Sequence, residues 1–518
     1  MFSCVQTITM KGLSPRFVKV EVDISPGLPM FEMIGYLSSE VKEARERVRT
    51  ALKNSGISLP TGHITVNLAP ADVRKEGTGF DLAIGLGILQ GMGKLRLENL
   101  EKTLVIGELG LNGQINGIRG VLPMVMAAKE AGFDRIILPK ENEKEGGLIP
   151  EVEIFSADHL GQVLDFLTRE KKRQKAMLYN RKQSVQKGDE QRKKSQKKGP
   201  DFSDIHGQDS MKRATVIAAA GLHNILYIGM PGVGKTMIAS RIPTILPPLT
   251  WEESLEVTKI YSISGLLSEE NPIQSRPPFR APHHTSSRQA LAGGGRYPMP
   301  GEISLAHLGV LFLDELPEFP KSTLEILRQP MEDKKICLAR AGGTYTYPAN
   351  FMLAAAMNPC KCGYFPDKQK CQCTPQEVRQ YLGKISQPLL DRIDLCVEAP
   401  SIRYEDLVDE GESQSSAQMA AKVQTAVSMQ RKRYKDTPFH FNSDLTASAI
   451  KEFCPISQDG EVLLKKVFEK MELSARSYHR IMKTARTIAD LEEKEVIEKK
   501  HIAEAVHYRS LDKKYWGR

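Results

Sequence analysis

The chain has 518 residues, too many for one hydrophobic core, so its length predicts two to four domains. A hydrophobic fraction of 41% and a charged fraction of 26% are ordinary for a globular protein, and no apolar run is long and uninterrupted enough to span a bilayer. The first residues lack the basic and apolar segments of a secretory signal. We therefore expect a cytoplasmic protein with no membrane partner, in which a disulfide framework is disfavoured.

The net charge of +9 is concentrated in one stretch. Residues 169–200 hold 13 Lys and Arg residues against three Asp and Glu residues, so the rest of the chain is about neutral. Because this stretch has almost no apolar residues, it predicts a disordered linker between domains. It could also bind a nucleic-acid backbone by counterion release, although a basic run is often simply solvated.

Residues 1–168 alternate strand-like and helix-like patterns. The alternation of apolar and polar residues predicts strands over 17–24 and 63–70, and apolar residues at helical spacing predict an amphipathic helix over 38–56. The apolar run FDLAIGLGIL, which starts at residue 80, predicts a buried helix.

Two segments of this region, HITVNLAPADVRKEGTGFDLAIGLGIL and IGELGLNGQINGIRGVLPMVMAAKEAGFDRIILPKEN, resemble the proteolytic domain of Lon-type proteases. Those enzymes use a serine nucleophile with a lysine as its base. Here Gly79 takes the place of the serine and Leu122 that of the lysine; a shift of one residue would bring Thr78 to the nucleophile position, still without a base. The resemblance therefore implies the fold without its chemistry, and we expect no peptidase activity.

A nucleotide-binding motif follows the linker. HNILYIGMPGVGKTMIASRIP (223–243) is a short apolar strand, a G-x-x-x-x-G-K-T loop and a helical pattern, the context that a P-loop requires. Its glycines let backbone N–H groups surround phosphate oxygens at a helix N-terminus. Lys235 is expected to reach the β- and γ-phosphates of ATP, and Thr236 to hold Mg²⁺. The residues predicted to bind the nucleotide are Gly229, Pro231, Gly232, Val233, Gly234, Lys235, Thr236 and Asp314.

Two further strand patterns end in polar residues. GVLFLDEL (309–316) predicts a buried strand that delivers Asp314 to the Mg²⁺ side of the site and Glu315 to the attacking water. NFMLAAAMNP (350–359) ends in Asn358, whose side chain could sense the γ-phosphate. The sequence thus predicts an ATP- and Mg²⁺-dependent hydrolase.

The order of this strand, Asn358 and PLLDRIDL (388–395) resembles the AAA+ ATPases, and among them the branch with the magnesium chelatase ATPase subunit and the MCM helicases. The resemblance implies that Arg392 is an arginine finger acting on ATP in the neighbouring subunit, worth roughly 10³–10⁵ in rate. A homo-oligomeric ring, expected to be a hexamer, is then part of the active site. The structural alternative is a salt bridge from Arg392 to Asp391 or Asp394.

The C-terminal region contains a predicted helix over 474–492, SARSYHRIMKTARTIADLE, behind a Ser474 cap. It resembles the lid helix of AAA+ proteins, which implies that Arg476 stands in the sensor-2 position, with Arg480 as the alternative. Either arginine could instead lie on a solvated helix face.

The expected fold is α/β: an AAA+ P-loop NTPase core of magnesium chelatase type over 201–410 and a C-terminal helical lid over 411–518. An α+β Lon-protease-like domain over 1–168 and the linker over 169–200 precede them.

Two segments between the shared motifs point to a substrate. FRAPHHTSSRQALAGGGRYPMPGEISLAHLG (279–309) is typical of a long functional loop; its His283 and His284 have no carboxylate or thiol nearby in sequence, which argues against a metal site. KKICLARAGGTYTYPA (334–349) predicts a hairpin of the kind that lines the ring pore in the MCM-like branch. Its candidate phosphate-contacting and base-stacking residues are Lys334, Lys335, Arg340, Tyr345 and Tyr347. An ordinary hairpin with solvated cations is the alternative.

Together, FRAPHHT, GGGRYPMPGEISLAHLGVLFLDELPEF, AAAMNPCKCG and LLDRIDL resemble the YifB/ComM family of magnesium-chelatase-like AAA+ ATPases. The resemblance implies ATP-driven work on single-stranded or branched DNA, such as branch migration in homologous recombination or natural transformation. The competing interpretation is a protein-remodelling ATPase of chelatase or chaperone type.

The segment 358–373, NPCKCGYFPDKQKCQC, holds Cys360, Cys362, Cys371 and Cys373. Four thiolates are the ligands of a closed, structural Zn²⁺ site, although the Cys-x-Cys spacing is tighter than the usual Cys-x₂-Cys. A redox-sensitive dithiol pair and unligated thiols are the alternatives. We expect the zinc to stiffen the loop between Asn358 and the finger segment.

Overall fold

The computed structural model describes residues 1–95, 100, 102–169, 171–179, 199–268, 270–295, 298–340, 343–400 and 413–517. The described chain divides into two compact units. Unit 1 contains residues 1–196 together with 254–274 and 339–346, and unit 2 contains the remainder. The division therefore differs from a single cut in the linker, because two segments of the predicted ATPase core belong to unit 1.

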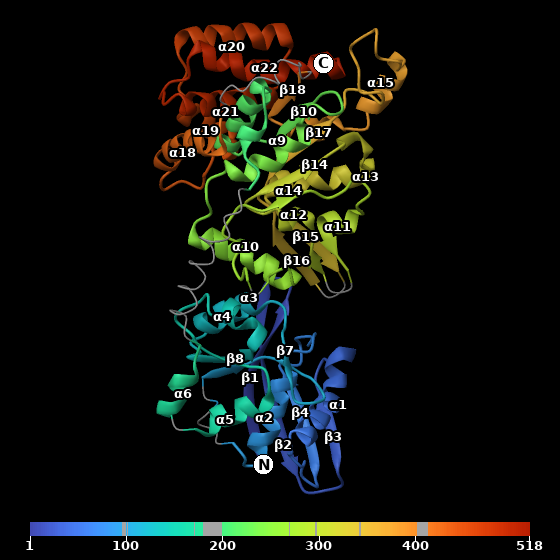
Figure 1. Cartoon of the computed structure of the whole chain (residues 1–518), viewed down its shortest axis with the longest axis vertical. Coiled ribbons are helices and arrows are strands. Elements are labelled where there is room, and N and C mark those ends of the chain that lie inside the picture. The colour runs from blue at the N-terminus through green and yellow to red at the C-terminus, as the bar shows by residue number, and fades with distance from the viewer. Residues whose placement is uncertain are drawn as a thin grey trace. The chain divides into compact units, whose positions relative to one another are not determined.

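Unit 1 is built on a mixed seven-stranded sheet in the order β3-β4-β2-β1-β5-β8-β9, labelled in Figure 1. Its strands are β1 (Phe2–Lys11), β2 (Ser14–Ser25), β3 (Met30–Ile34), β4 (His63–Ala69), β5 (Thr103–Val105), β8 (Arg135–Pro139) and β9 (Glu153–Ala157), with a separate hairpin of β6 (Glu108–Leu109) and β7 (Ile115–Asn116). Its helices are α1 (Ser39–Asn54), α2 (Asp81–Gly91), α3 (Val121–Glu130), α4 (Glu143–Gly146), α5 (Leu160–Thr168), α6 (Lys171–Met177) and α10 (Trp251–Ser264), with the 3₁₀ turn η2 (Lys140–Asn142).

The predicted elements of this unit agree with the structure in α1, α2, β2 and β4. The linker prediction differs at its start, where α6 forms a helix with Gln174 buried and its side-chain amide bonded to the carbonyl of Phe166 at 3.0 Å. Polar contacts thus order a segment that its composition assigned to disorder. Residues 170 and 180–198 of the predicted linker lie outside the described residues.

Unit 2 contains a parallel five-stranded sheet in the order β11-β14-β17-β10-β18. These strands are β11 (Phe279–Arg280), β14 (Val310–Leu313), β17 (Met352–Met357), β10 (Ile225–Ile228) and β18 (Leu395–Glu398). Strand β17 lies between β10 and β14, so the residues that follow these three strands emerge at one edge of the sheet.

Short elements surround this sheet. They are η3 (Phe202–Asp204), α8 (Asp209–Gly221), α9 (Lys235–Arg241), η4 (Ile242–Thr244), α11 (Arg288–Ala292), β12 (Gly293–Gly294), β13 (Met299–Pro300), α12 (Glu302–Leu305), η5 (Leu316–Glu318), α13 (Lys321–Leu324), η6 (Glu325–Leu327), α14 (Arg328–Asp333), β15 (Lys335–Arg340), β16 (Gly343–Pro348), α15 (Pro375–Leu382) and α16 (Gln387–Leu390).

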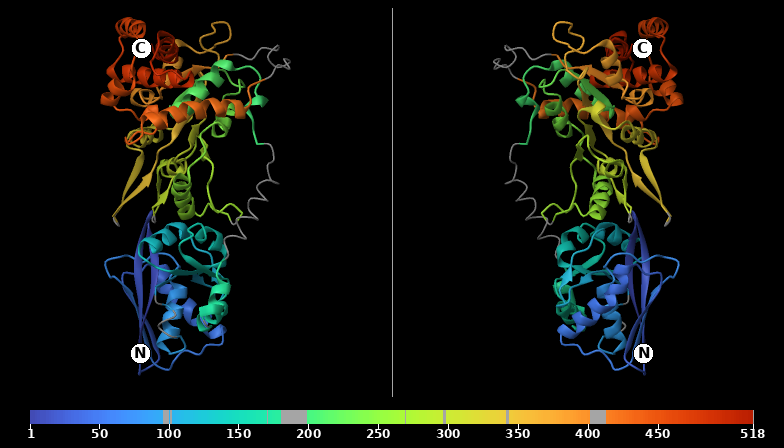
Figure 2. Two further views of the ribbon diagram at one scale, coloured as in Figure 1. Left: turned by 90° about the vertical axis from the view of Figure 1, so that its left-hand side faces the viewer. Right: turned by 90° about the vertical axis from the view of Figure 1, so that its right-hand side faces the viewer.

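The predicted helical lid is present and packs beside α8 and β18 (Figure 2). It consists of α18 (Ser416–Arg433), η7 (Asn442–Asp444), α19 (Ala447–Phe453), α20 (Gln458–Met471), α21 (Ala475–Leu491) and α22 (Lys499–Trp516). The expected Ser474 cap is formed, since its side chain accepts a bond from the backbone N–H of Ser477. One continuous apolar core includes both sheet and lid residues, such as Ile225 and Ile488, so the lid and the sheet are not independent layers.

Candidate functional site

The P-loop connects β10 to α9 and is shaped by glycines. Gly232 and Gly234 have φ of +80° and +86°, a left-handed conformation that favours glycine. At Gly229 an added Cβ would lie 2.6 Å from the Cβ of Ala399, so a side chain has no room there. These glycines allow the turn by which P-loops direct backbone amides at an anion, while the amide of Gly229 itself donates to the carbonyl of Met357 at 3.2 Å.

The side chain of Lys235 folds back over its own loop. Its Nζ donates to the carbonyls of Gly229 and Met230 at 2.7 and 2.8 Å, and to Oδ1 of Asn358 at 3.1 Å. Burial lowers the pKa of Lys235, and the carboxylates of Asp314 and Glu315 oppose this shift. Lys235 is thus hydrogen-bonded to three oxygen atoms, one of which belongs to Asn358, the predicted γ-phosphate sensor.

The carboxylates that follow β14 lie beside the P-loop helix. Oδ2 of Asp314 accepts a hydrogen bond from Oγ1 of Thr236 at 2.6 Å, so the two predicted Mg²⁺ ligands are adjacent. Glu315 has a left-handed φ of 52°, which is uncommon for a residue with a side chain and typical of strained functional positions. The structure therefore brings Lys235, Thr236, Asp314, Glu315 and Asn358 to one sheet edge.

A histidine contacts the predicted catalytic glutamate, and sequence reasoning missed it. Nδ1 of His284 lies 3.1 Å from Oε2 of Glu315, and the His283 ring lies 4.0 Å from that of His284. The absence of a carboxylate nearby in sequence was misleading, because Glu315 is close only in space. Strands β11 and β14 are parallel neighbours, so the segments that follow them emerge side by side. This pairing would have predicted that His284 lies near Glu315.

Arg392 follows α16 and is mostly buried, with 10% of its side chain exposed. Its guanidinium donates to the carbonyl of Pro388 at 2.5 Å and pairs with Glu332 of α14. The predicted alternative pairing with Asp391 or Asp394 is thus not the arrangement in the structure, where a third carboxylate takes that role.

The two sensor-2 candidates have different surroundings. Arg476, at the start of α21, is 59% exposed and lies 3.6 Å from the same Glu332 carboxylate. Arg480, one turn later, is 12% exposed; it lies near Asp394 and donates to the carbonyls of Leu390 and Ile393. Of the two candidates, Arg476 is thus the more exposed, and Arg480 is bound to residues of its own chain.

The four cysteines of the 358–373 loop converge as predicted. All four sulfur atoms lie within 4.8 Å of one another, and the Sγ atom of Cys360 is 3.3 and 3.8 Å from those of Cys362 and Cys371. Tetrahedral zinc with Zn–S bonds near 2.3 Å separates its sulfurs by about 3.8 Å, so the donor set fits Zn²⁺. Desolvation raises the pKa of Cys371 to about 12, whereas at Cys362 hydrogen bonds outweigh desolvation and lower the pKa to about 6.

This cysteine loop packs against the P-loop. Gly363 has a φ of +86°, and an added Cβ would lie 2.6 Å from Cδ of Pro231. The cysteine loop therefore lies against the P-loop at Pro231, a contact that the sequence did not predict.

The predicted hairpin is formed by β15 and β16, and residues 341 and 342 lie outside the described residues. The expectation for Tyr347 as a base-stacking residue is wrong, because its side chain is fully buried and its hydroxyl donates to the carbonyl of Pro298. Lys334 pairs with Asp444 of the lid. Lys335 and Arg340 are exposed, whereas the ring of Tyr345 is partly exposed and has Nζ of Lys11 6.0 Å from its centroid.

The positions of the Lon-type dyad carry other contacts in unit 1. Thr78 donates its hydroxyl to Glu108, and the N–H of Leu122 donates to Oε1 of Glu145 at 2.8 Å. Burial raises the pKa of Glu145, while hydrogen bonds from Ser262 of α10 and from the start of α3 oppose the shift. At the position of the dyad lysine, Leu122 thus binds a buried carboxylate through its backbone N–H.

Among the described residues, no helix is long and apolar enough to cross a membrane.

Comparisons with known proteins agree along the chain. Family models described as "Magnesium chelatase, subunit ChlI", "Subunit ChlI of Mg-chelatase" and "Magnesium chelatase, subunit ChlI C-terminal" match residues 201–407, 20–142 and 413–509. The chain is 40% identical to Competence protein ComM of Haemophilus influenzae over 96% of both chains, and 41% identical to the uncharacterized protein YifB of Escherichia coli over 99% of this chain and 97% of that one. Residues of this chain are also 30% identical to Lon protease 2 of Bacillus subtilis over 146 residues, 27% of this chain and 26% of the protease.

Proposed function

Because the chain belongs to the YifB/ComM family of magnesium-chelatase-like AAA+ ATPases, we propose that it is an ATP-hydrolysing hexameric ring motor that acts on single-stranded or branched DNA. The observation that most supports hydrolysis is the meeting of Lys235, Thr236, Asp314 and Asn358 at one sheet edge. The proposed role is branch migration or strand separation during homologous recombination or natural transformation.

The chemistry is assigned residue by residue. Lys235 leaves its carbonyl partners to bind the β- and γ-phosphates, and Thr236 and Asp314 would hold Mg²⁺, which neutralises phosphate charge when bound. Glu315 orients the attacking water and accepts its proton, while Asn358 contacts the γ-phosphate. Arg392 of one subunit completes the site of the next, so hydrolysis depends on assembly.

Two observations support DNA as the substrate. Lys335, Arg340 and Tyr345 of the β15–β16 hairpin offer cations for phosphates and a ring for stacking on a base. In addition, a relative that matches along almost its whole length is named a competence protein. We assign the hairpin as the DNA contact on these grounds.

We also propose that Cys360, Cys362, Cys371 and Cys373 hold one structural Zn²⁺ per chain. The sulfur separations support a closed four-thiolate site, which has no open position for catalysis.

ATPase assays with and without DNA test the proposed substrate. Wild type is expected to hydrolyse ATP faster with forked or single-stranded DNA, and the increase should fall steeply with salt. Glu315→Gln should bind ATP without turnover, and Lys235→Ala should abolish strand displacement and branch migration. Stimulation by a protein and by no DNA would overturn the proposal in favour of the protein-remodelling interpretation, and no turnover by wild type would overturn hydrolysis itself.

A further inference from the structure

We propose that the lid holds the arginine finger of its own chain, with Arg480 and Arg509 as positioning residues for Arg392. This inference rests on the proposed function, since it takes Arg392 as the finger. It assigns Arg480 a role different from nucleotide sensing.

The lid binds the backbone of the finger segment. This segment, residues 388–394, contains the end of α16 and the turn that connects it to β18. The carbonyl of Ile393 accepts hydrogen bonds from Arg509 of α22 at 2.8 Å and from Arg480 of α21 at 3.3 Å. Arg480 also reaches the carbonyl of Leu390 at 3.4 Å, so two planar guanidinium groups fix both sides of Arg392.

The side chain of Asp394 connects Arg480 of the lid to His223 and Asn224, which directly precede strand β10. Its carboxylate lies 3.7 Å from Nε of Arg480 and 3.6 Å from Nδ1 of His223, and it accepts the backbone N–H of Asn224 at 3.1 Å. Nε2 of His223 lies 2.7 Å from Oγ1 of Thr487 on α21. The carboxylate is thus held from the lid side and from the core side at once.

Asn224 fixes the finger residue to the sheet. Its side-chain amide donates to the carbonyl of Arg392 at 2.9 Å, and its Oδ1 accepts the N–H of Leu353 in β17 at 2.8 Å. The sheet thus holds one end of this chain of contacts, and the lid holds the other.

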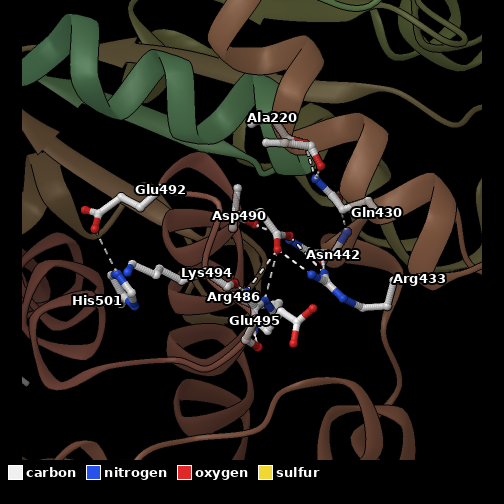
Figure 3. A network of polar contacts seen from close by, with 12 residues as sticks. Ala220, Gln430, Arg433, Asn442, Arg486, Asp490, Glu492, Lys494, Glu495 and His501 are labelled. Atoms are coloured by element: carbon white, nitrogen blue, oxygen red, sulfur yellow. Dashed lines mark hydrogen bonds and ion pairs between the residues drawn. The ribbon is translucent and has the colours of Figure 1, made fainter.

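Helix α21 is itself joined to the rest of the lid by a buried polar network. Asp490 near its end is fully buried and accepts bonds from Arg433 of α18, Asn442 of η7 and Arg486 of its own helix, as Figure 3 shows. A fully satisfied buried network fixes a single arrangement of the elements it joins. Arg476, at the opposite end of α21, is exposed near Glu332, the carboxylate that also pairs with Arg392.

Mixed rings separate this role from nucleotide sensing. Lys235→Ala subunits cannot use ATP but supply a finger, and Arg392→Ala subunits bind ATP but lack one, so mixing the two is expected to restore hydrolysis. We then place Arg480→Ala, and separately Arg509→Ala, in either the finger donor or the ATP-binding partner. Arg431→Ala, an exposed arginine of α18, is the matched control in both positions.

If the inference holds, either substitution in the donor reduces the restored rate by about 10- to 100-fold, as expected for a displaced catalytic group. The same substitution in the ATP-binding partner should leave the restored rate within about twofold, which also shows that the variant folds. In unmixed rings, kcat should fall while the nucleotide KM stays within about twofold.

Three results would count against these assignments, and they are distinguishable. Full restoration by the substituted donors overturns the positioning role. Loss of activity when Arg480→Ala is in the ATP-binding partner alone identifies Arg480 as a sensor of its own nucleotide. Failure of the parent mixture to restore hydrolysis overturns the proposed finger and ring instead.

Discussion

Replacing Gly363 with alanine tests whether the cysteine loop supports the P-loop. An L-residue at a φ of +86° costs about 1–2 kcal/mol. The new Cβ would lie 2.6 Å from Cδ and 3.1 Å from Cγ of Pro231, against a normal carbon–carbon contact of about 3.5 Å. The rigid proline ring leaves the P-loop or the cysteine loop to move by roughly 1 Å.

The effect on nucleotide binding follows from this strain. Overpacking of this kind costs about 1–3 kcal/mol, and where the P-loop moves to relieve the clash this corresponds to a nucleotide affinity lowered by about 5- to 150-fold. Titration with a fluorescent ATP analogue measures this change directly. Metal content, measured on the same samples, shows whether the four-cysteine site is intact.

Gly132→Ala is the matched control. Gly132 has a φ of +80° with no atom within 4 Å of the added Cβ, so it carries the backbone strain without the contact. It should lower thermal stability and leave nucleotide affinity unchanged. Equal nucleotide Kd values for the Gly363→Ala and Gly132→Ala variants, with metal content intact, would refute the supporting role of the loop.

Three further predictions concern other contacts. Burial alone would raise the pKa of Asp394, but His223, Arg480 and Lys483 lower it to about 2. The charged carboxylate therefore stabilises the folded state fully above about pH 4, and this stabilisation is lost as the pH falls toward 2. Asp394→Asn should therefore cost roughly 2 kcal/mol at pH 7, with a difference from wild type that shrinks below pH 4 in unfolding titrations; a pH-independent difference would contradict this. His284→Ala should release Glu315 and raise the DNA-free ATPase rate by about two- to fivefold, because one hydrogen bond between partly exposed groups contributes about 0.5–1 kcal/mol. A lower rate would instead mean that His284 holds Glu315 in its working orientation. Cys371→Ser should abolish zinc binding, as measured by elemental analysis, and lower Tm by about 5 °C or more. Cys337→Ser, at an exposed cysteine outside the cluster, should change neither the zinc content nor Tm. Zinc retained by the Cys371→Ser variant would refute the four-thiolate site.

Local patterns predicted the elements that carry the nucleotide site. The P-loop, the strand before Asp314 and the strand before Asn358 are each encoded within about ten consecutive residues, and parallel pairing then brings their ends together. The Ser474 cap and the convergence of the cysteines are similarly short-range.

Contacts between distant segments were beyond the same reasoning. His284 meets Glu315, and Gly363 meets Pro231, only because of the order of strands in the sheet. The hairpin pattern predicted two strands but not which face of β16 is covered, so Tyr347 was assigned to solvent although it is buried. Alternation sets which side chains share a face, and tertiary packing decides which face is covered.

The position of α10 limits how the chain can be divided. In sequence, this helix lies between the P-loop and the strand before Asp314, yet most of it belongs to unit 1. There Leu255 is part of an apolar cluster, and Ser262 donates a hydrogen bond to Glu145. A shortened chain starting at residue 199 would keep α10 but lose the surface that covers it, leaving apolar side chains exposed to water. The protease-like fold, although it lacks the dyad, is thus the packing partner of a helix encoded within the ATPase and is not a removable appendage.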